Sequence, residues 1–141
     1  MFLLRLGLGL VFFWAGWEKV IDPEWSAAGY LMGAKTFKTL YIWFASPGVL
    51  PVTNFLNEWG LTLIGLALIV GFSVRLASFF GIVMMALYYL PIFPPAHGLV
   101  DEHIIYSLVF LALIAFGSGE ILSLGKWFQT HLHPAWHKWI D

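Results

Sequence analysis

The chain has 141 residues, of which 60% are hydrophobic, 18% aromatic and 11% charged, whereas roughly 25% of residues are charged in an average soluble domain. A water-soluble fold of this length cannot bury so much apolar surface. The formal net charge of −1 gives no support for a nucleic-acid partner. The absence of cysteine excludes disulfides, thiolate metal sites and thiol redox chemistry.

The hydrophobic residues gather in segments that approach or reach the roughly 17 to 25 residues needed to cross a bilayer. These are residues 2–21, 52–72, 76–93 and 100–118. We therefore predict an all-α integral membrane protein, a four-transmembrane-helix bundle that forms a single membrane domain over residues 1–141. The first segment also resembles a cleaved signal peptide, but bulky side chains continue to Trp17, where a cleavage site needs small residues. We expect it to be a retained helix.

Residues 23–48, between the first two spans, are too many for a simple turn. The stretch "DPEW", which begins at Asp22, predicts an N-cap and the first turn of a helix. Apolar and aromatic residues then recur at helical spacing between positions 37 and 44. We expect one or two interfacial helices here, and an interfacial C-terminal tail over residues 120–141, because its tryptophans and lysines suit the headgroup layer.

The distribution of lysine and arginine favours cytoplasmic termini in the plasma membrane. The side of the bundle that holds the termini would carry Arg5, Arg75, Lys126 and Lys138, and the opposite side Lys19, Lys35 and Lys38. The acids Asp22, Glu24, Glu58, Asp101 and Glu102 gather on that opposite side. We therefore expect a polar site at the outer side.

Glu58 is the first candidate for a functional residue, because ionisable groups at membrane depth are costly. It lies about 9 Å inside the second predicted span and shares a helix face with Asn54, one turn earlier. Lys19, at the same end of the first span, is the natural counter-charge. The alternative is that Glu58 lies in the wet headgroup layer without a function.

Residues 101 to 103 place three ionisable side chains at the start of the last span. Asp101 is expected to cap that helix. His103 shares a face with Tyr106 and Ser107, and an imidazole can both donate and accept a proton. Glu102, His103 and Tyr106 are therefore predicted to exchange protons with a redox-active lipid headgroup, although a histidine hydrogen-bonded for packing is the alternative.

Metal binding is the less favoured interpretation. No His-Glu-x-x-His spacing is present, and the histidines of the tail suit an interfacial anchor as well as a divalent site. We expect no metal. Small residues should instead allow close contact between helices, at Gly7, Gly9, Gly60, Gly65, Ala77 and Gly81.

Two longer stretches carry a family pattern. "RLGLGLVFFWAGWEK" contains Arg5, Phe12, Gly16 and Lys19, and "EWGLTLIGLALIVGFSVRLA" contains Glu58, Gly60, Gly65, Gly71 and Arg75. With "EWSAAGYL", "VDEHIIY" and "GSGEILSLGKW", they resemble the DoxX family, in particular the DoxD-like branch related to the membrane subunit of thiosulfate:quinone oxidoreductase. The resemblance extends to about residue 127. It implies a four-helix membrane bundle linked to quinone chemistry or to an oxidoreductase complex.

The leading hypothesis is therefore a quinone-interacting subunit of a membrane oxidoreductase. Glu58, Glu102, His103 and Tyr106 would handle protons, and the quinone would be bound by Lys19, Asn54, Trp14, Trp17, Trp25 and Trp59. Expected partners are membrane lipids, a redox protein and a second copy of the chain. A non-catalytic scaffold for lipids or proteins is the alternative. A small-solute transporter is less favoured, because inverted repeats and discontinuous spans are not evident.

Overall fold

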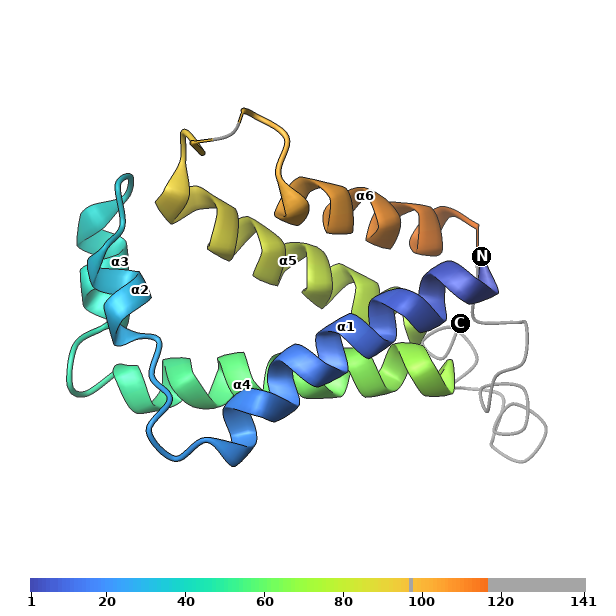
Figure 1. Cartoon of the computed structure of the whole chain (residues 1–141), viewed down its shortest axis with the longest axis horizontal. Helices are drawn as coiled ribbons and strands as arrows, with labels where there is room; N and C mark the ends of the chain where they lie inside the picture. The colour runs from blue at the N-terminus through green and yellow to red at the C-terminus, as the bar shows by residue number, and fades with distance from the viewer. Residues whose placement is uncertain (97, 117–141) are drawn as a thin grey trace, which may run out of the picture.

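The structure is a computed structural model that describes residues 1–96 and 98–116. Within these ranges all regular structure is helical and there are no strands (Figure 1). The helices are α1 (Phe2–Ile21), α2 (Ala28–Met32), α3 (Lys38–Phe44), α4 (Leu50–Val70), α5 (Val74–Ile92) and α6 (Glu102–Ala115). The predicted tail, residues 120–141, lies outside the described residues.

The long helices follow the predicted spans closely. α1 coincides with residues 2–21, whereas α4 and α5 each begin two residues earlier than predicted. Pro51 lies in the first turn of α4, where its missing N–H costs nothing. Gly71 ends the helix in the left-handed conformation, with φ of 72°. A short turn then leads directly into α5.

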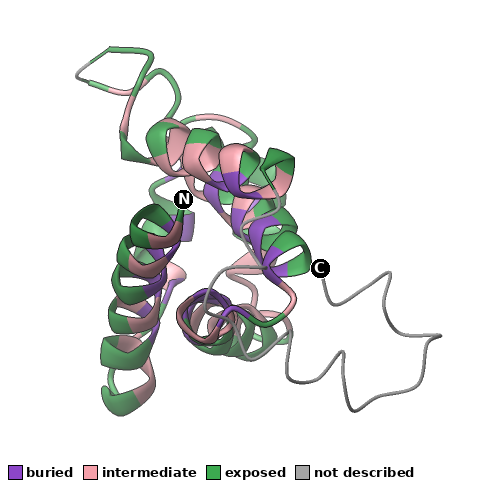
Figure 2. Ribbon diagram, turned by 90° about the vertical axis from the view of Figure 1, so that its right-hand side faces the viewer, coloured by how far each residue is buried: buried purple, intermediate pink, exposed green. Residues whose placement is uncertain are grey.

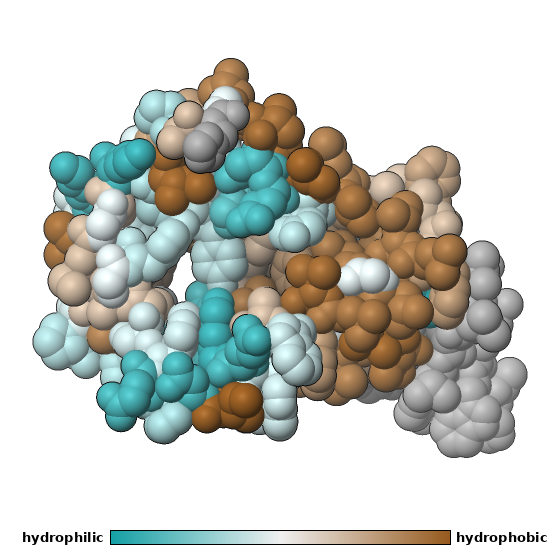
Figure 3. Space-filling view, viewed as in Figure 1, coloured by the Kyte–Doolittle hydropathy of each residue, from teal (hydrophilic) through white to brown (hydrophobic). Residues whose placement is uncertain are grey.

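Of the helices described, α4 and α5 are long and apolar enough to cross a membrane. α1 has 20 residues but includes Arg5, Glu18 and Lys19. The described part of α6 has 14 residues and spans about 21 Å, less than the roughly 30 Å of a hydrocarbon core. On the face shown in Figure 3, hydrophobic side chains cover the long helices, while hydrophilic side chains gather at the end that holds α2 and α3.

Helices α1, α4, α5 and α6, which we call the long helices, pack as antiparallel neighbours. Between α1 and α4, Lys19 contacts Asn57 at one end, and Gly9 lies next to Ile69 at the other. In the same way, α5 and α6 are joined by Tyr88 with His103 and by Gly81 with Phe110. Buried residues lie on the sides of the helices that face one another (Figure 2). Lys19, Asn57, Tyr88 and His103 therefore lie at one end of the bundle, which we call the polar end.

Two glycines bring the backbones of α1 and α4 together. A Cβ on Gly16 would lie 2.4 Å from Thr62 Oγ1, and one on Gly65 would lie 2.2 Å from the Phe13 nitrogen. The predicted role of Gly65 in close helix contact is confirmed. The same prediction for Gly7 is wrong, because a Cβ there would meet nothing within 4 Å.

The core between the long helices is apolar and aromatic. Phe12 of α1 meets Phe110 of α6 edge to face, with 5.0 Å between the ring centroids. Around this pair lie buried side chains from all four long helices: Leu8, Leu61, Ile64, Leu68, Val74, Met85 and Leu113. The contact joins the α1–α4 pair to the α5–α6 pair.

The connection between α1 and α4 contains two short helices, as predicted, but the first begins later than expected. Asp22 Oδ1 accepts a hydrogen bond of 3.0 Å from the Glu24 N–H, which makes a turn rather than a helix N-cap. Aspartate forms such side-chain turns readily. The helix predicted to start at Pro23 is therefore wrong, and α2 starts at Ala28. The helical spacing after residue 37 does form α3.

α2 and α3 are fastened to the C-terminal end of α5. Pro91 has no N–H, so the Leu87 carbonyl lacks its usual partner within the helix. The buried Tyr41 hydroxyl donates to this carbonyl at 2.8 Å. Burial raises the pKa of Tyr41, which keeps its hydroxyl protonated as the donor.

Further hydrogen bonds from the same connection reach the last turn of α5. The Tyr30 hydroxyl donates to the Tyr88 carbonyl, and the Thr36 hydroxyl donates to the Leu90 carbonyl. The Lys35 N–H donates to the Pro91 carbonyl at 2.7 Å. Burial raises the pKa of Tyr30 to about 12, so this donor also stays protonated at physiological pH. The connection thereby holds a fixed position against α5.

We expect Tyr41→Phe to lower the free energy of unfolding by about 1–3 kcal/mol, because the Leu87 carbonyl would lose the donor that the buried Tyr41 supplies. Thermal unfolding in detergent micelles measures the change. Tyr89→Phe is the matched control: it removes a hydroxyl that donates at 2.7 Å to the Leu99 carbonyl at an exposed position. Equal losses from both substitutions would contradict the assigned role of Tyr41.

Candidate functional site

Lys19, in the last turn of α1, is the centre of the polar end. Its Nζ donates a hydrogen bond of 2.8 Å to Asn57 Oδ1 on α4. The ammonium also lies over two aromatic rings, 4.8 Å from the Trp25 centroid and 5.6 Å from the Tyr88 centroid, within cation–π range. Glu58 supplies the nearby negative charge. A partly buried cation is thus held by one amide, two rings and one acid.

Tyr88 of α5 connects this cation to the other helices. Its ring meets the rings of His103 and Tyr30 edge to face, with centroid distances of 6.0 and 6.3 Å. Its hydroxyl is buried beside the Asn57 side chain and makes no hydrogen bond of normal geometry to any described residue. Tyr88 therefore presents an unused polar group at the meeting point of the helices.

His103 is oriented by Asp101. The imidazole Nδ1 lies 2.7 Å from Asp101 Oδ2, while Oδ1 accepts from the backbone N–H groups of His103 and Ile104 at 3.1 and 3.2 Å. The predicted N-cap role of Asp101 is confirmed. Asp101 also fixes the imidazole ring, which leaves Nε2 as the nitrogen directed elsewhere. The ring therefore faces Asp101 rather than Tyr106.

A cavity of about 490 Å³ extends from the polar end between α4, α5 and the α2–α3 connection. It runs along α4 from Thr53 to Ile64, a length of about 16 Å. Asn57 and Tyr88 belong to its wall, so the polar cluster and the cavity are continuous. Most other lining groups are apolar, among them Leu56, Leu63, Phe80, Val83, Met84 and Leu87. Its size and lining suit an elongated apolar molecule with a polar head.

The polar end brings together part of the predicted site. Lys19, Glu58, His103 and Trp25 all lie in or next to the cluster around Tyr88. Asn54 has a different contact: its Oδ1 accepts from the Ala27 N–H at 3.0 Å, and its Nδ2 lies 3.4 Å from Ser26 Oγ. It positions the chain segment that carries Trp25.

Other predicted residues lie apart from the cluster. Glu102 is exposed in the first turn of α6, about 100° around the helix from His103. Tyr106 packs edge-on against Phe12 in the core, at 5.9 Å between centroids. The exposed tryptophans stand on outer helix surfaces: Trp14 (62% exposed), Trp17 (40%) and Trp59 (38%). Their side chains do not enclose the cavity.

Sequence reasoning missed Asn57 and Tyr88. Asn57 is next to Glu58 but points to a different side of α4, toward Lys19. Tyr88 belongs to a Tyr-Tyr pair at the end of an apolar span, which is typical of an interfacial aromatic belt. The sequence did hold one signal, the position of each residue in its helix. In antiparallel neighbours, the C-terminal parts of α1 and α5, with Lys19 and Tyr88, lie beside the N-terminal parts of α4 and α6, with Asn57 and His103.

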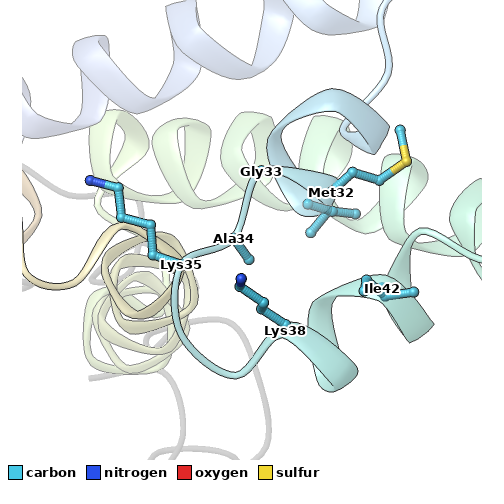
Figure 4. Close-up of a pocket in the computed structure, with 7 residues that line it drawn as sticks. Met32, Gly33, Ala34, Lys35, Lys38 and Ile42 are labelled. Carbon is cyan, nitrogen blue, oxygen red and sulfur yellow. The ribbon is translucent and has the colours of Figure 1, made fainter.

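A second pocket, of about 380 Å³, lies between α2 and α3 (Figure 4). Lys38 reaches toward Ala34 in the loop between α2 and α3, while Lys35 points away from the pocket. Both lysines are exposed, as are Met32 and Phe37 nearby. Exposed lysines among exposed apolar side chains are typical of a segment at a membrane surface.

The described residues contain no group of three side chains that could hold a metal ion. Comparison with curated proteins and with solved structures gives no match. The DoxX family model matches residues 1–92, which include Lys19, Asn57 and Tyr88 together with the helices that form the cavity. This match covers well over half of the chain. Together with the apolar helices, it identifies a membrane protein that belongs to the DoxX family.

Proposed function

We propose that the chain is a quinone-interacting subunit of a membrane oxidoreductase, with the ring at the polar end and the isoprenoid tail in the cavity. The observation that carries this proposal is the continuity between the two parts: Asn57 and Tyr88 belong both to the cluster around Lys19 and to the wall of the 490 Å³ cavity. Amphiphilic redox carriers need such a combination of an apolar slot and a few convergent polar groups.

In this proposal, different residues of the polar end would bind the ring and exchange protons with it. Lys19 and Asn57 would orient the oxygen atoms of the ring, while the α2–α3 connection keeps bulk water from the apolar wall. Quinones carry two electrons and two protons when they are reduced. His103, oriented by Asp101 and packed against Tyr88, is the group suited to exchange protons beside the site.

All four long helices would cross the plasma membrane, with cytoplasmic termini and the polar end on the outer side. A redox protein at that side would exchange electrons with the bound ring, and the chain would belong to the DoxD-like branch of its family. The exposed lysines and aromatic side chains of residues 23–48 would contact lipid headgroups.

The test is quinone binding by the purified protein in detergent micelles. Decylubiquinone is expected to raise the thermal unfolding temperature in a concentration-dependent way, and Lys19→Gln to weaken its affinity roughly ten-fold, because a charge-assisted contact is lost. Lys35→Gln is the matched control, since Lys35 is an exposed lysine outside the cluster. Absence of any stabilisation of the wild type would overturn the proposal and favour a non-catalytic scaffold.

A further inference from the structure

Most polar groups in the cavity wall are already used by the fold. The Tyr30 and Tyr41 hydroxyls donate to carbonyls of α5. The Thr53 hydroxyl lies 3.2 Å from the carbonyls of Phe44 and Val49. Because each of these hydroxyl hydrogens has an acceptor within the protein, none is free for a ligand.

Two polar groups in the wall remain for a ligand, and both can donate. Asn57 Oδ1 receives the Lys19 ammonium, which leaves the Nδ2 amide hydrogens on the other branch of the same side chain. The Tyr88 hydroxyl is buried beside the Asn57 side chain, and its hydrogen has no acceptor of normal geometry among the described residues. Even when its oxygen accepts a hydrogen bond, its hydrogen still needs an acceptor. The cavity therefore presents hydrogen-bond donors next to a cation.

We infer that the Tyr88 hydroxyl and the Asn57 amide together bind a carbonyl oxygen of the ligand, so that the site prefers the oxidised quinone to the quinol. This inference rests on the proposed function and specifies its ligand. A carbonyl oxygen accepts two hydrogen bonds and satisfies both donors. A quinol hydroxyl brings a hydrogen of its own. It can donate this hydrogen to the Tyr88 oxygen, but the Tyr88 hydrogen then loses its acceptor, and a buried donor without a partner lowers affinity.

The first variant removes only the hydroxyl. We expect Tyr88→Phe to weaken decylubiquinone binding roughly five-fold and to reduce the preference for decylubiquinone over decylubiquinol to near one. Both affinities are measured by ligand-dependent thermal shift, with the quinol kept reduced by dithionite. Tyr89→Phe is the matched control, because its hydroxyl donates to Leu99 instead; its affinities should equal those of the wild type.

The second variant separates binding from folding. Asn57→Asp keeps an oxygen for the Lys19 ammonium but removes the amide hydrogens and adds a negative charge. It should retain the unfolding temperature of the ligand-free protein and lose decylubiquinone binding by at least ten-fold. If Tyr88→Phe and Asn57→Asp both bind as the wild type does, the inference is wrong while quinone binding stands. If the wild type binds neither redox form, the proposed function itself fails.

Discussion

Gly65→Ala is expected to force α1 and α4 apart and to lower the free energy of unfolding by about 1–3 kcal/mol, the usual cost of overpacking a core. The added Cβ would lie 2.2 Å from the Phe13 nitrogen, 2.5 Å from its Cα and 2.7 Å from the Gly9 carbonyl oxygen. All three atoms belong to the backbone of α1. No change of side-chain rotamer can relieve the contact, so one helix must move.

Such a movement would also affect the polar end. Lys19 and Asn57 lie on the same two helices as Gly65, and their hydrogen bond of 2.8 Å tolerates only a small displacement. Gly65→Ala should therefore weaken decylubiquinone binding as well as stability. A retained affinity would mean that α1 moves as a hinge rather than as a rigid unit.

Gly7→Ala provides the matched control on α1. A Cβ there meets nothing within 4 Å, and alanine costs less conformational entropy than glycine in a helix. The unfolding temperature in detergent should thus stay unchanged or rise for Gly7→Ala and fall for Gly65→Ala. A fall of similar size for both would show that helix propensity, and not close packing, explains the effect.

The long helices could be predicted from the sequence because their signals are local. Hydrophobic length sets α4 and α5, and the proline and glycine near their ends mark the boundaries within two residues. The start of α2 could not be found in this way. "DPEW" suits both a helix N-cap and a tight turn. In the structure, Asn54 holds the backbone N–H of Ala27 from a distant part of the chain, a contact that the local sequence does not reveal.

The candidate site was only partly predictable, for a geometric reason. Ionisable residues within apolar segments are easy to recognise in a sequence, so Lys19, Glu58 and His103 could be selected from their positions alone. Which neighbour they meet depends on the rotation of each helix about its axis. A step of one residue turns a side chain by about 100°, which separates Asn57 from Glu58 and His103 from Glu102.

The largest effect at the polar end is expected from Asn57→Leu, which removes the only hydrogen-bond acceptor that the described structure gives the Lys19 ammonium. Hydrogen bonds to charged groups contribute about 1.5–3 kcal/mol, and a buried charge left without its partner costs more than the bond was worth. We expect the free energy of unfolding to fall by at least about 2 kcal/mol. Decylubiquinone binding should be lost.

A double-mutant cycle with Lys19→Met isolates this interaction. Once the ammonium is absent, the Asn57→Leu substitution leaves no charge without a partner, and methionine preserves much of the packing against Trp25. The double variant should therefore unfold at a higher temperature than Asn57→Leu alone, yet still fail to bind decylubiquinone. Strictly additive losses of stability would show that Lys19 finds another acceptor, with Glu58 the nearest acid. In that case the Lys19–Asn57 bond would serve the ligand and not the fold.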